Sequence, residues 1–525
     1  MIDLILNDQD IATDLPEGMT VLDFVRYRQD LKGTKIGCRE GDCGACTVLV
    51  GELLDGDVRY RSMTSCLMPL ANAAGKHIVT VEGINPENRG LTPVQQAMVD
   101  ESGTQCGFCT VGFVMSLTGF CLNKPSEPDE MQAGSLRSDA ISAIDGNICR
   151  CTGYKSIERA AAAISNLMSE PGAIATGFPP VVPPYFADIP KRLARMVNER
   201  PPKGGTQNVF VGGGTDVYVQ KPDAMAESDA AHLLYDHELR GIRDTGTHIE
   251  IGASVTVTDL LESSIMNAAF PDLYKHLKLV SSTPIRNMAT LAGNFVNASP
   301  IGDMTVWFLA LDTEIELAGG NASVNERAES NDHVGTLLNS RVSARTIPLR
   351  DLYLGYKQLA KSHEEYITAI RFKKPTGDFR FNFEKVCKRT YLDIASVNTA
   401  TSLTVRSTPG EGWLPPVLSE PGATVAGPTS NTGTSYEPEP TGSKVNHEIV
   451  SAHVAAGGVS PIPLYLKKTS EFLVGKLVDA ETISAANVIM QSEISPISDV
   501  RGTEQYKRLL LRQLFCAHFY EMFGI

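Results

Sequence analysis

Short apolar runs separated by glycine and aspartate turns predict a small β-rich domain over residues 1–82. The runs expected to form strands are Ile2–Leu6, Thr47–Val50 and Ile78–Val81. One helix is expected behind the N-cap residue Thr20, where apolar residues from Val21 to Leu31 recur at helical spacing. The first domain is therefore predicted to be a sheet with a single helix packed against it.

Between residues 83 and 168 the apolar positions change to helical spacing, which predicts a small helical bundle. The segments with this spacing are Pro93–Met98, Gly112–Leu117 and Ser156–Ala161. Six prolines then fall between residues 169 and 190, and this composition favours an extended linker between domains.

Beyond the linker, short β runs alternate with helical patterns over residues 191–380, which predicts an α/β domain. Residues 381–525 are expected to form an α+β C-terminal domain that ends in a helix, Gln505–Met522, with a buried stripe including Leu509. Two expected strands of this domain, Thr399–Val405 and His447–Val454, flank residues 407–444. That stretch is rich in Pro, Gly, Ser, Thr and Glu, so we expect a disordered insertion. The whole chain is predicted to be a multidomain α+β protein.

The composition narrows the class of protein. The 525 residues are 42% hydrophobic and carry a formal charge of −14, with a pI near 5.3. No nucleic-acid partner is expected, because such binding depends on clustered Lys and Arg. A mean hydropathy of −0.08 without a long apolar run predicts no membrane segment. The first residues lack the basic and apolar regions of a signal peptide, so we expect a cytoplasmic protein.

The distribution of the 11 cysteines points to metal. Eight of them lie in two groups within the first 151 residues. In a reducing compartment, grouped cysteines are more often metal ligands or redox groups than disulfides. The other three cysteines are scattered and have no predicted role: Cys121, Cys387 and Cys516.

The first cysteine group has the C-x4-C-x2-C spacing of plant-type [2Fe–2S] ferredoxins, followed by a more distant fourth cysteine. Its predicted ligands are Cys38, Cys43, Cys46 and Cys66. Gly37, Gly41 and Gly44 would permit positive φ, so that the loop curls around the cluster and directs amide groups at the sulfurs. A structural zinc site is the alternative, although zinc sites usually combine two C-x2–4-C pairs.

The second cysteine group comes from two segments that each open a predicted helix. Its predicted ligands are Cys106, Cys109, Cys149 and Cys151. Two helix N-termini would direct free N–H groups and positive dipole ends at one anionic centre, which suits a second [2Fe–2S] cluster. Zinc is again the alternative, because C-x2-C with C-x-C also occurs in zinc sites.

Together the two groups carry a family resemblance. The motifs Gly-Cys-x4-Cys-Gly-x-Cys, Gln-Cys-Gly-x-Cys and Cys-Arg-Cys-Thr-Gly-Tyr, in this order, resemble the iron–sulfur half of the molybdenum hydroxylases. The resemblance implies a β-grasp ferredoxin-like domain followed by a helical-bundle [2Fe–2S] domain. It extends essentially end to end, apart from the linker and residues 407–444.

Two later segments resemble the FAD-binding domain of the same family. The first is a glycine-rich turn, Val211–Asp216, whose successive amides can hold a pyrophosphate, and the second runs from Thr283 to Asp303. Alone, each segment could equally be an ordinary polar or glycine turn. A third segment, Phe383–Ala395, resembles the family's flavin-edge motif and places Lys385 near the isoalloxazine. The residues that the resemblance implies for FAD binding are Val211, Gly212, Gly213, Gly214, Thr215, Asp216, Ala289, Thr290, Gly293, Asn294, Asn297, Ser299, Asp303 and Lys385.

The resemblance implies an electron-transfer subunit that needs no acid–base catalytic residue of its own. Substrate oxidation requires molybdopterin, and no part of the chain after residue 380 is long enough to hold it. We therefore expect a molybdopterin-binding large subunit as partner, in a heterotetramer with two copies of each chain.

The chain is most similar to the purine-oxidising members of the family. This implies oxidation of hypoxanthine and xanthine to urate on the partner, with electrons passing through the second cysteine group, the first group and FAD to NAD+. A related hydroxylase of aldehydes or N-heterocycles is one alternative. A zinc-stabilised scaffold with no redox role is another.

Overall fold

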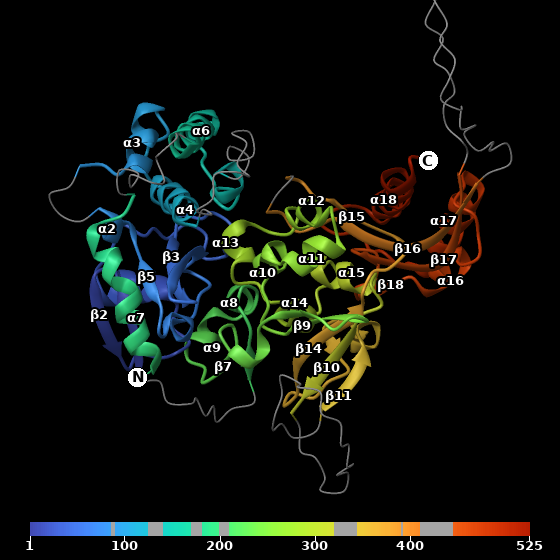
Figure 1. The fold of residues 1–525 in the computed structure, drawn as a ribbon, viewed down its shortest axis with the longest axis horizontal. Helices are drawn as coiled ribbons and strands as arrows, with labels where there is room; N and C mark the ends of the chain where they lie inside the picture. The colour runs from blue at the N-terminus through green and yellow to red at the C-terminus, as the bar shows by residue number, and fades with distance from the viewer. Residues whose placement is uncertain are drawn as a thin grey trace, which may run out of the picture.

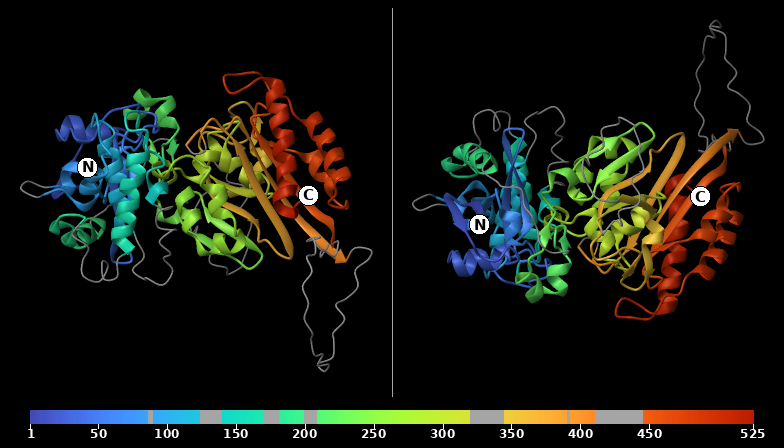
Figure 2. Two further views of the ribbon diagram at one scale, coloured as in Figure 1. Left: turned by 90° about the horizontal axis from the view of Figure 1, so that it is seen from above. Right: turned by 90° about the horizontal axis from the view of Figure 1, so that it is seen from below.

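The computed structural model describes the chain apart from residues 86–89, 124–139, 170–180, 199–208, 320–343, 390–391 and 410–444. The N-terminal domains lie at one end, the FAD-binding part in the middle and the C-terminal domain at the other end (Figures 1 and 2). This order confirms the predicted multidomain α+β architecture. None of the helices in the described ranges combines the length and apolar character that crossing a bilayer would require.

The first domain is a five-stranded sheet with the order β2-β1-β5-β3-β4, in which β1 and β5 run parallel. Its strands are β1 Ile2–Leu6, β2 Gln9–Thr13, β3 Thr47–Leu54, β4 Asp57–Thr64 and β5 His77–Val79. As predicted, a helix begins behind Thr20, whose hydroxyl accepts the N–H of Asp23 at 3.2 Å. This helix, α1 (Val21–Asp23), widens into the π-helix η1 (Phe24–Arg28), so Leu31 lies beyond its end.

The second domain packs its helices against the same sheet. Its helices are α2 Val81–Ile84, α3 Pro93–Asp100, α4 Thr110–Leu122 and α6 Lys155–Ser169. Helix α4 lies on β3 and β4, and its Phe113 and Leu117 enter a buried cluster that includes Leu49 of the sheet. The predicted helical bundle is present, and it is joined to the first domain through a common core.

Part of the predicted linker lies within the described residues. Residues 170–180 lie outside the described residues, but a 3-10 helix, η4 (Pro184–Asp188), and helix α7 (Ile189–Asn198) follow them. Phe186 packs on Tyr60 with ring centroids 5.4 Å apart. Arg192 of α7 forms ion pairs with Asp8 at 2.8 Å and Asp10 at 2.7 Å. The extended-linker prediction is therefore wrong for residues 184–190, because they form helical turns and their Phe186 and Ile189 pack on the first domain.

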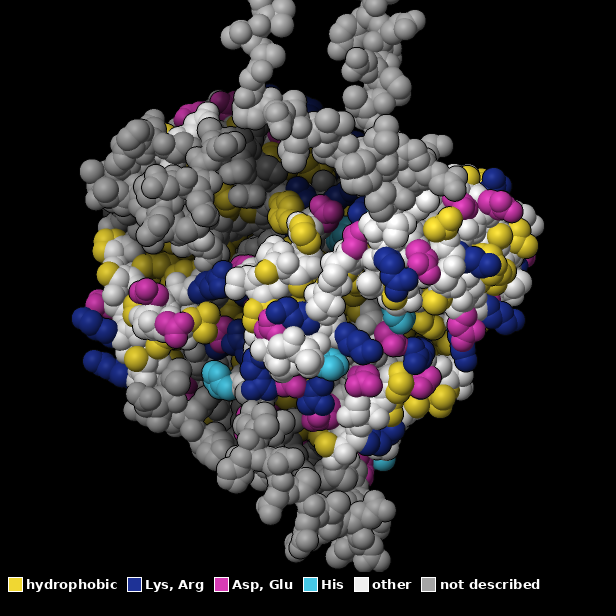
Figure 3. Space-filling view, turned by 45° about the vertical axis from the view of Figure 1, so that its right-hand side comes forward, with side chains coloured by type: hydrophobic (Ala, Val, Ile, Leu, Met, Phe, Trp, Pro, Cys, Tyr) yellow, Lys and Arg dark blue, Asp and Glu magenta, His cyan; other side chains and the backbone are white. Residues whose placement is uncertain are grey.

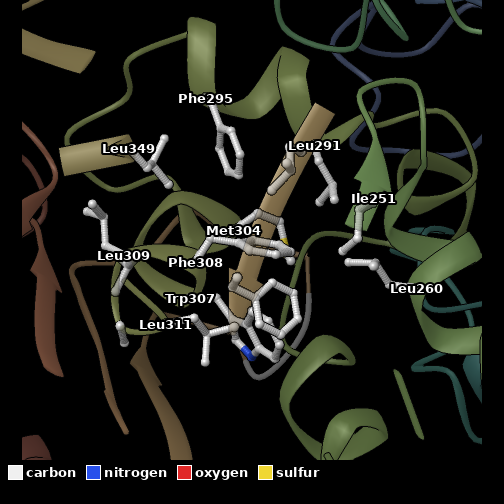
Figure 4. Packing of buried hydrophobic residues seen from close by; sticks show 14 of the residues in the cluster. Ile251, Leu260, Leu291, Phe295, Met304, Trp307, Phe308, Leu309, Leu311 and Leu349 are labelled. Carbon is white, nitrogen blue, oxygen red and sulfur yellow. The ribbon is translucent and has the colours of Figure 1, made fainter. Parts of the chain in front are cut away.

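The FAD-binding part combines a short parallel pair, β6 with β7, and a five-stranded antiparallel sheet with the order β11-β10-β14-β9-β8. Its core centres on α15, where Trp307 and Phe308 are fully buried (Figure 4). The strands are β6 Phe210–Val211, β7 Ala231–His232, β8 Ile242–Asp244, β9 His248–Gly252, β10 Glu314–Ala318, β11 Ala344–Pro348, β12 Tyr353–Gly355, β13 Gln358–Leu359 and β14 Tyr366–Lys373. The α-helices are α8 Val217–Gln220, α9 Pro222–Ala226, α10 Val257–Glu262, α11 Ser264–Ala269, α12 Leu273–Leu277, α13 Thr283–Arg286, α14 Leu291–Val296 and α15 Asp303–Leu309.

The C-terminal domain packs three helices on a four-stranded antiparallel sheet. Its elements are β15 Asp378–Val386, β16 Val397–Pro409, β17 Val445–Gly457, β18 Leu464–Tyr465, α16 Lys467–Leu473, α17 Ala480–Glu493 and α18 Glu504–Phe523. The two predicted strands pair, with Thr401 opposite Val454. Residues 410–444 of the predicted insertion lie outside the described residues, whereas 407–409 belong to β16. On α18 the predicted stripe is buried at Leu514, Phe515 and Phe519, but Leu509 is exposed and Leu511 is buried in its place.

One hydrophobic cluster spans the first domain and the FAD-binding part. It contains strand residues such as Leu4 and Val48 together with Val211, Tyr218 and Met225 from the segment that carries the glycine-rich turn. The Tyr218 hydroxyl also donates to the carbonyl of Gly18 at 3.1 Å. The glycine-rich turn is thus anchored in the core of the ferredoxin-like domain.

Candidate functional site

The four cysteines of the first group lie in two pairs at one edge of the first domain. Cys38 and Cys43 belong to the loop between η1 and β3, whereas Cys46 directly precedes β3 and Cys66 follows β4. The Cys43 thiol hydrogen-bonds the Cys38 sulfur and lowers the pKa of Cys38 to about 5. The Cys66 thiol acts in the same way on Cys46 and lowers its pKa. The thiols of this group are therefore arranged two by two.

The glycines of this loop are required for two different reasons. Gly41 and Gly44 have φ of 79° and 65°, in the left-handed region that the sequence predicted for them. Gly37 is needed for space, because a Cβ there would lie 2.5 Å from the Cys43 sulfur. The backbone N–H of Glu40 donates to the Cys38 sulfur at 3.3 Å, so amide groups face this thiol as expected.

The second cysteine group is also paired, across two segments that are distant in sequence. The sulfurs of Cys106 and Cys151 are 3.6 Å apart. Burial and a hydrogen bond with Cys149 raise the pKa of Cys109 to about 12. Cys109 is the N-cap of α4, and Cys151 lies four residues before α6, so both predicted helix starts are present. The fold thus brings the C-x2-C motif of Cys106 and Cys109 next to the C-x-C motif of Cys149 and Cys151.

The pairing distinguishes between the two kinds of metal site. Among the described residues, no three His, Cys, Asp or Glu side chains converge on a single point, as a zinc ion with four protein ligands requires. A binuclear cluster needs only two cysteines at each iron. Two thiolates bound about 2.3 Å from one tetrahedral metal are roughly 3.7 Å apart, close to the 3.6 Å between Cys106 and Cys151. The residues fit two [2Fe–2S] clusters better than zinc.

The two cysteine groups touch each other through their backbones. The N–H of Ile148, next to Cys149, donates to the carbonyl of Cys43 at 3.1 Å. The Asn147 amide donates to the Gly44 carbonyl at 3.1 Å. Asn147 is buried, and sequence analysis gave it no role because its side-chain hydrogen bonds join distant segments.

The two groups also differ in exposure. Cys106 and Cys151 are exposed, whereas Cys46 and Cys66 are buried. The Cys106–Cys151 pair is therefore accessible to another protein, whereas the Cys46–Cys66 pair is buried in the protein interior.

The fold brings together the first two predicted FAD segments. The turn after β6 lies so close to Met288 and Thr290 that a Cβ on Gly213 would be 1.7 Å from the Met288 carbonyl oxygen. Within the described part of the chain, the N–H groups of Gly213, Gly214 and Thr215 have no hydrogen-bond partner, which leaves them available to an anionic group. Ala289 and Thr290 lie alongside, and Thr290 accepts the N–H of Gly293 at 3.2 Å. This cradle fits a pyrophosphate.

The remaining polar groups of this region form hydrogen bonds among themselves. Asp216 accepts from Gln220, and its pKa is raised by burial. Asn297 accepts from Lys357 at 2.8 Å. Neither Gln220 nor Lys357 belongs to a recognisable motif, so sequence analysis missed both. Asn294 accepts from the N–H and hydroxyl of Thr305, and Ser299 accepts from the N–H of Ile301 at 3.4 Å.

Lys385 forms a buried ion pair instead of projecting freely. Its ammonium group is 2.7 Å from a carboxylate oxygen of Asp303 and also donates to the carbonyl of Leu279 at 2.8 Å. Asn398 donates to the other oxygen of Asp303 at 2.6 Å. The C-terminal domain therefore supplies two donors to a carboxylate of the FAD-binding part. Asn398 was not singled out in the sequence, because it lies in an ordinary strand pattern.

Four family models match the chain in sequence order. They are the 2Fe–2S iron–sulfur cluster binding domain (residues 4–71), the [2Fe–2S] binding domain (80–162), the FAD binding domain in molybdopterin dehydrogenase (189–330) and the CO dehydrogenase flavoprotein C-terminal domain (441–522). Together, and in this order, these domains fit the small subunit of a molybdenum hydroxylase. The resemblance seen in the motifs is thereby confirmed, and the chain carries two iron–sulfur domains and an FAD domain.

The curated relatives of this molybdenum hydroxylase chain include xanthine dehydrogenases. It is 25% identical to xanthine dehydrogenase 1 of Arabidopsis thaliana, over 93% of this chain and 37% of that protein. The identity to the xanthine dehydrogenase of Oryza sativa subsp. japonica is 27%, over 76% of this chain and 33% of the relative. The chain thus spans little more than a third of the length of these relatives.

Solved structures similar to the chain include a Cu,Mo-CO dehydrogenase and quinoline 2-oxidoreductase from Pseudomonas putida 86. The first is 23% identical with a TM-score of 0.44, covering 59% of this chain and 87% of that chain. The second is 18% identical with a TM-score of 0.43, covering 60% of this chain and 88% of that chain.

On the face shown in Figure 3, basic and acidic side chains are interspersed over the described surface.

Proposed function

We propose that this chain is the iron–sulfur and FAD subunit of a xanthine dehydrogenase. Its partner would be a molybdopterin-binding large subunit that oxidises hypoxanthine and xanthine to urate, in a heterotetramer with two copies of each chain. The names of the curated relatives support the substrate class.

The proposed ligands follow the pairs found in the structure. Cys38 with Cys43 and Cys46 with Cys66 would hold one [2Fe–2S] cluster. The other cluster would be held by the remaining two pairs, Cys106 with Cys151 and Cys109 with Cys149. The two-by-two arrangement of the thiols is the single observation that carries the redox assignment, because it matches a binuclear cluster and not a single zinc ion.

The exposure of the cysteines gives the proposed order of electron transfer. The exposed pair, Cys106 and Cys151, would face the molybdopterin-binding chain. Inside the chain, Ile148 contacts Cys43 and so connects the second group to the first. Gly214 lies against the carbonyl of Leu67, directly after Cys66, which connects the first group to the glycine-rich turn. The contacts therefore run in series from the surface to the FAD-binding part.

The FAD-binding part would hold its cofactor through two kinds of group. The N–H groups of Gly213, Gly214 and Thr215, which have no hydrogen-bond partner among the described residues, would bind the pyrophosphate. The paired Lys385 and Asp303 would lie near the flavin ring. When bound, the clusters pass single electrons, and FAD collects two and delivers a hydride, for which NAD+ is the proposed acceptor. The role of the protein residues would be to position these groups.

The cofactor assignment can be tested on the purified full-length chain. We expect visible absorption from flavin and iron–sulfur centres, and two distinct EPR signals after reduction. Replacing Cys106 and Cys151 by serine should remove one signal and leave the other. A colourless, zinc-containing protein would contradict the proposed redox function.

The substrate and acceptor require the complex with the molybdopterin-binding chain. We expect urate formation from hypoxanthine and xanthine with NAD+ as acceptor. Parallel assays with an aldehyde and with quinoline serve as controls for the other substrate classes. Turnover of either one without purine oxidation would refute the proposed substrate and leave the electron-transfer role intact.

A further inference from the structure

A single short helix, α13, contacts all three regions that carry the predicted redox groups. Its Ile285 lies against Gly41 of the first cysteine loop, where an added Cβ would be 2.8 Å from the Ile285 side chain. Its Pro284 lies against Gly146, three residues before Cys149, with 2.7 Å to an added Cβ. The helix leads directly to Ala289 of the proposed FAD site. Any displacement of α13 would therefore change the relative positions of three sites.

A buried ion pair joins α13 to the second cysteine domain. The guanidinium group of Arg286 is 2.6 Å from the carboxylate of Asp145, and the two side chains are 4% and 3% exposed. Arg286 also donates to the carbonyls of Val280 and Ser281 at 2.9 and 3.0 Å. The other carboxylate oxygen of Asp145 accepts the N–H of Thr283 at 2.6 Å. Both charged groups are thus fully engaged across a domain boundary.

The ion pair that joins the FAD-binding part to β3 is more exposed and involves neither cysteine segment. Arg240 of the FAD-binding part pairs with Glu52 of β3 at 2.8 Å, with 21% and 12% of the side chains exposed. Because charges that are fully buried are costly unless they are paired, the Arg286–Asp145 contact tolerates little displacement. Both residues of this pair are also close in sequence to predicted site residues. Asp145 precedes Cys149 by four residues, and Arg286 precedes Ala289 by three.

We propose that Arg286 and Asp145 are positioning residues that set the spacing between the second cluster, the first cluster and FAD. Their ion pair docks the Ser142–Cys151 segment on α13, which in turn packs on the first cysteine loop and leads into the FAD site. Among the described residues, neither side chain hydrogen-bonds a predicted cluster ligand. This inference rests on the proposed electron-transfer function. It adds that the Arg286–Asp145 ion pair fixes the distances between the three centres.

The test compares full-length Asp145→Asn and Arg286→Lys variants with the wild-type chain. Both variants keep polar side chains of similar size, so we expect iron and flavin contents to be retained. We expect the dipolar coupling between the two reduced clusters, measured by pulsed EPR, to change in both. Electron transfer from the clusters to flavin, followed by stopped-flow absorbance, should slow severalfold in both variants, because the rate of electron tunnelling falls steeply as the distance between centres grows.

Arg240→Gln is the matched control, because it breaks an ion pair between domains away from the cysteine segments. It should leave the dipolar coupling unchanged even if it lowers the melting temperature. Wild-type coupling and rates in Arg286→Lys would overturn the proposal while leaving the electron-transfer function standing. If Asp145→Asn does not accumulate, Arg286→Lys decides alone. A wild-type chain without the two EPR signals would overturn both proposals.

Discussion

The backbone N–H of Ile148 donates to the carbonyl oxygen of Cys43 across 3.1 Å, so a single hydrogen bond separates the peptides of two different cysteine groups. The two residues are 105 positions apart in the sequence. Asn147, directly before Ile148, holds the same contact from its side chain through Gly44. The close approach of the two loops therefore depends on a buried amide.

Replacing Asn147 by Ala should destabilise the chain by about 1–3 kcal/mol, because the Gly44 carbonyl would lose a buried donor. Chemical unfolding followed by circular dichroism measures the loss. Ser116→Ala is the control, since it removes only the 2.8 Å bond from Ser116 to the Asn147 carbonyl oxygen and leaves the contact with Gly44. Equal losses in the two variants would show that the bond between the loops contributes nothing of its own.

Gly37→Ala should disrupt the first cysteine group alone. Its Cβ would lie 2.5 Å from the Cys43 sulfur, so the thiol must move out of its pair. We expect loss of one of the two EPR signals and of about half of the iron, as two clusters of equal size imply. Gly90→Ala is the matched control, because its Cβ meets no atom of the described residues within 4 Å. Retention of both signals in Gly37→Ala would contradict the predicted ligand set.

The Lys385–Asp303 pair should be important for flavin retention. Lys385→Met leaves the Asp303 carboxylate without its cation in a site where the lysine side chain is 1% exposed. Breaking a buried pair in this way typically costs about 3–5 kcal/mol. We expect a lower melting temperature and less FAD after gel filtration. The exposed pair of Lys374 with Asp244 is the comparison, and Lys374→Met should change stability by less than about 0.5 kcal/mol.

Two buried histidines should make the chain sensitive to acid. Burial lowers the pKa of His276 to about 4 and that of His518 to about 3, and both contact Asn382. In the unfolded chain these histidines titrate near 6.5, so below that pH the unfolded state binds protons that the folded state does not. Their contribution to stability is therefore complete above about pH 6.5 and is lost as the pH falls toward 4.

This acid sensitivity can be measured as the free energy of unfolding between pH 7.5 and 5. His518→Gln should reduce the pH dependence by about one proton, whereas the exposed His363→Gln should leave it unchanged. The variants must be compared because Glu384 also contacts Asn382 and burial raises its pKa. Glu384 therefore makes the free energy of unfolding fall as the pH rises, whereas the buried histidines make it rise. An unchanged slope in His518→Gln would exclude this residue as the source.

Local patterns were sufficient to predict several elements. The apolar run Ile2–Leu6 is strand β1, and Thr20 caps the first helix through a contact three residues away. The cysteine segments before α4 and α6 lie where the spacing placed them. These features depend on neighbours within one or two turns of the chain, which is the range that sequence periodicity reports.

Contacts between distant segments could not be predicted in the same way. The Arg286–Asp145 pair, the docking of Arg192 on Asp8 and the partner of Lys385 all join residues more than eighty positions apart. The spacing of the eight grouped cysteines shows which of them belong together but not which thiols pair. The sequence suggested that Gly37 is needed for a positive φ. The structure shows instead that a side chain at this position would collide with the Cys43 sulfur.

The hydrophobic cluster that contains both Val48 and Met225 has a consequence for how such chains can be recombined. A ferredoxin-like module is usually regarded as a unit that can be moved between proteins. Here, cutting the chain after its cysteine domains would expose the apolar surface covered by Tyr218 and Met225 and leave the glycine-rich turn without support. Replacement of this module by another ferredoxin would require matching changes in α8 and α9. The ferredoxin-like domain and the segment that contains these two helices are therefore constrained to evolve together.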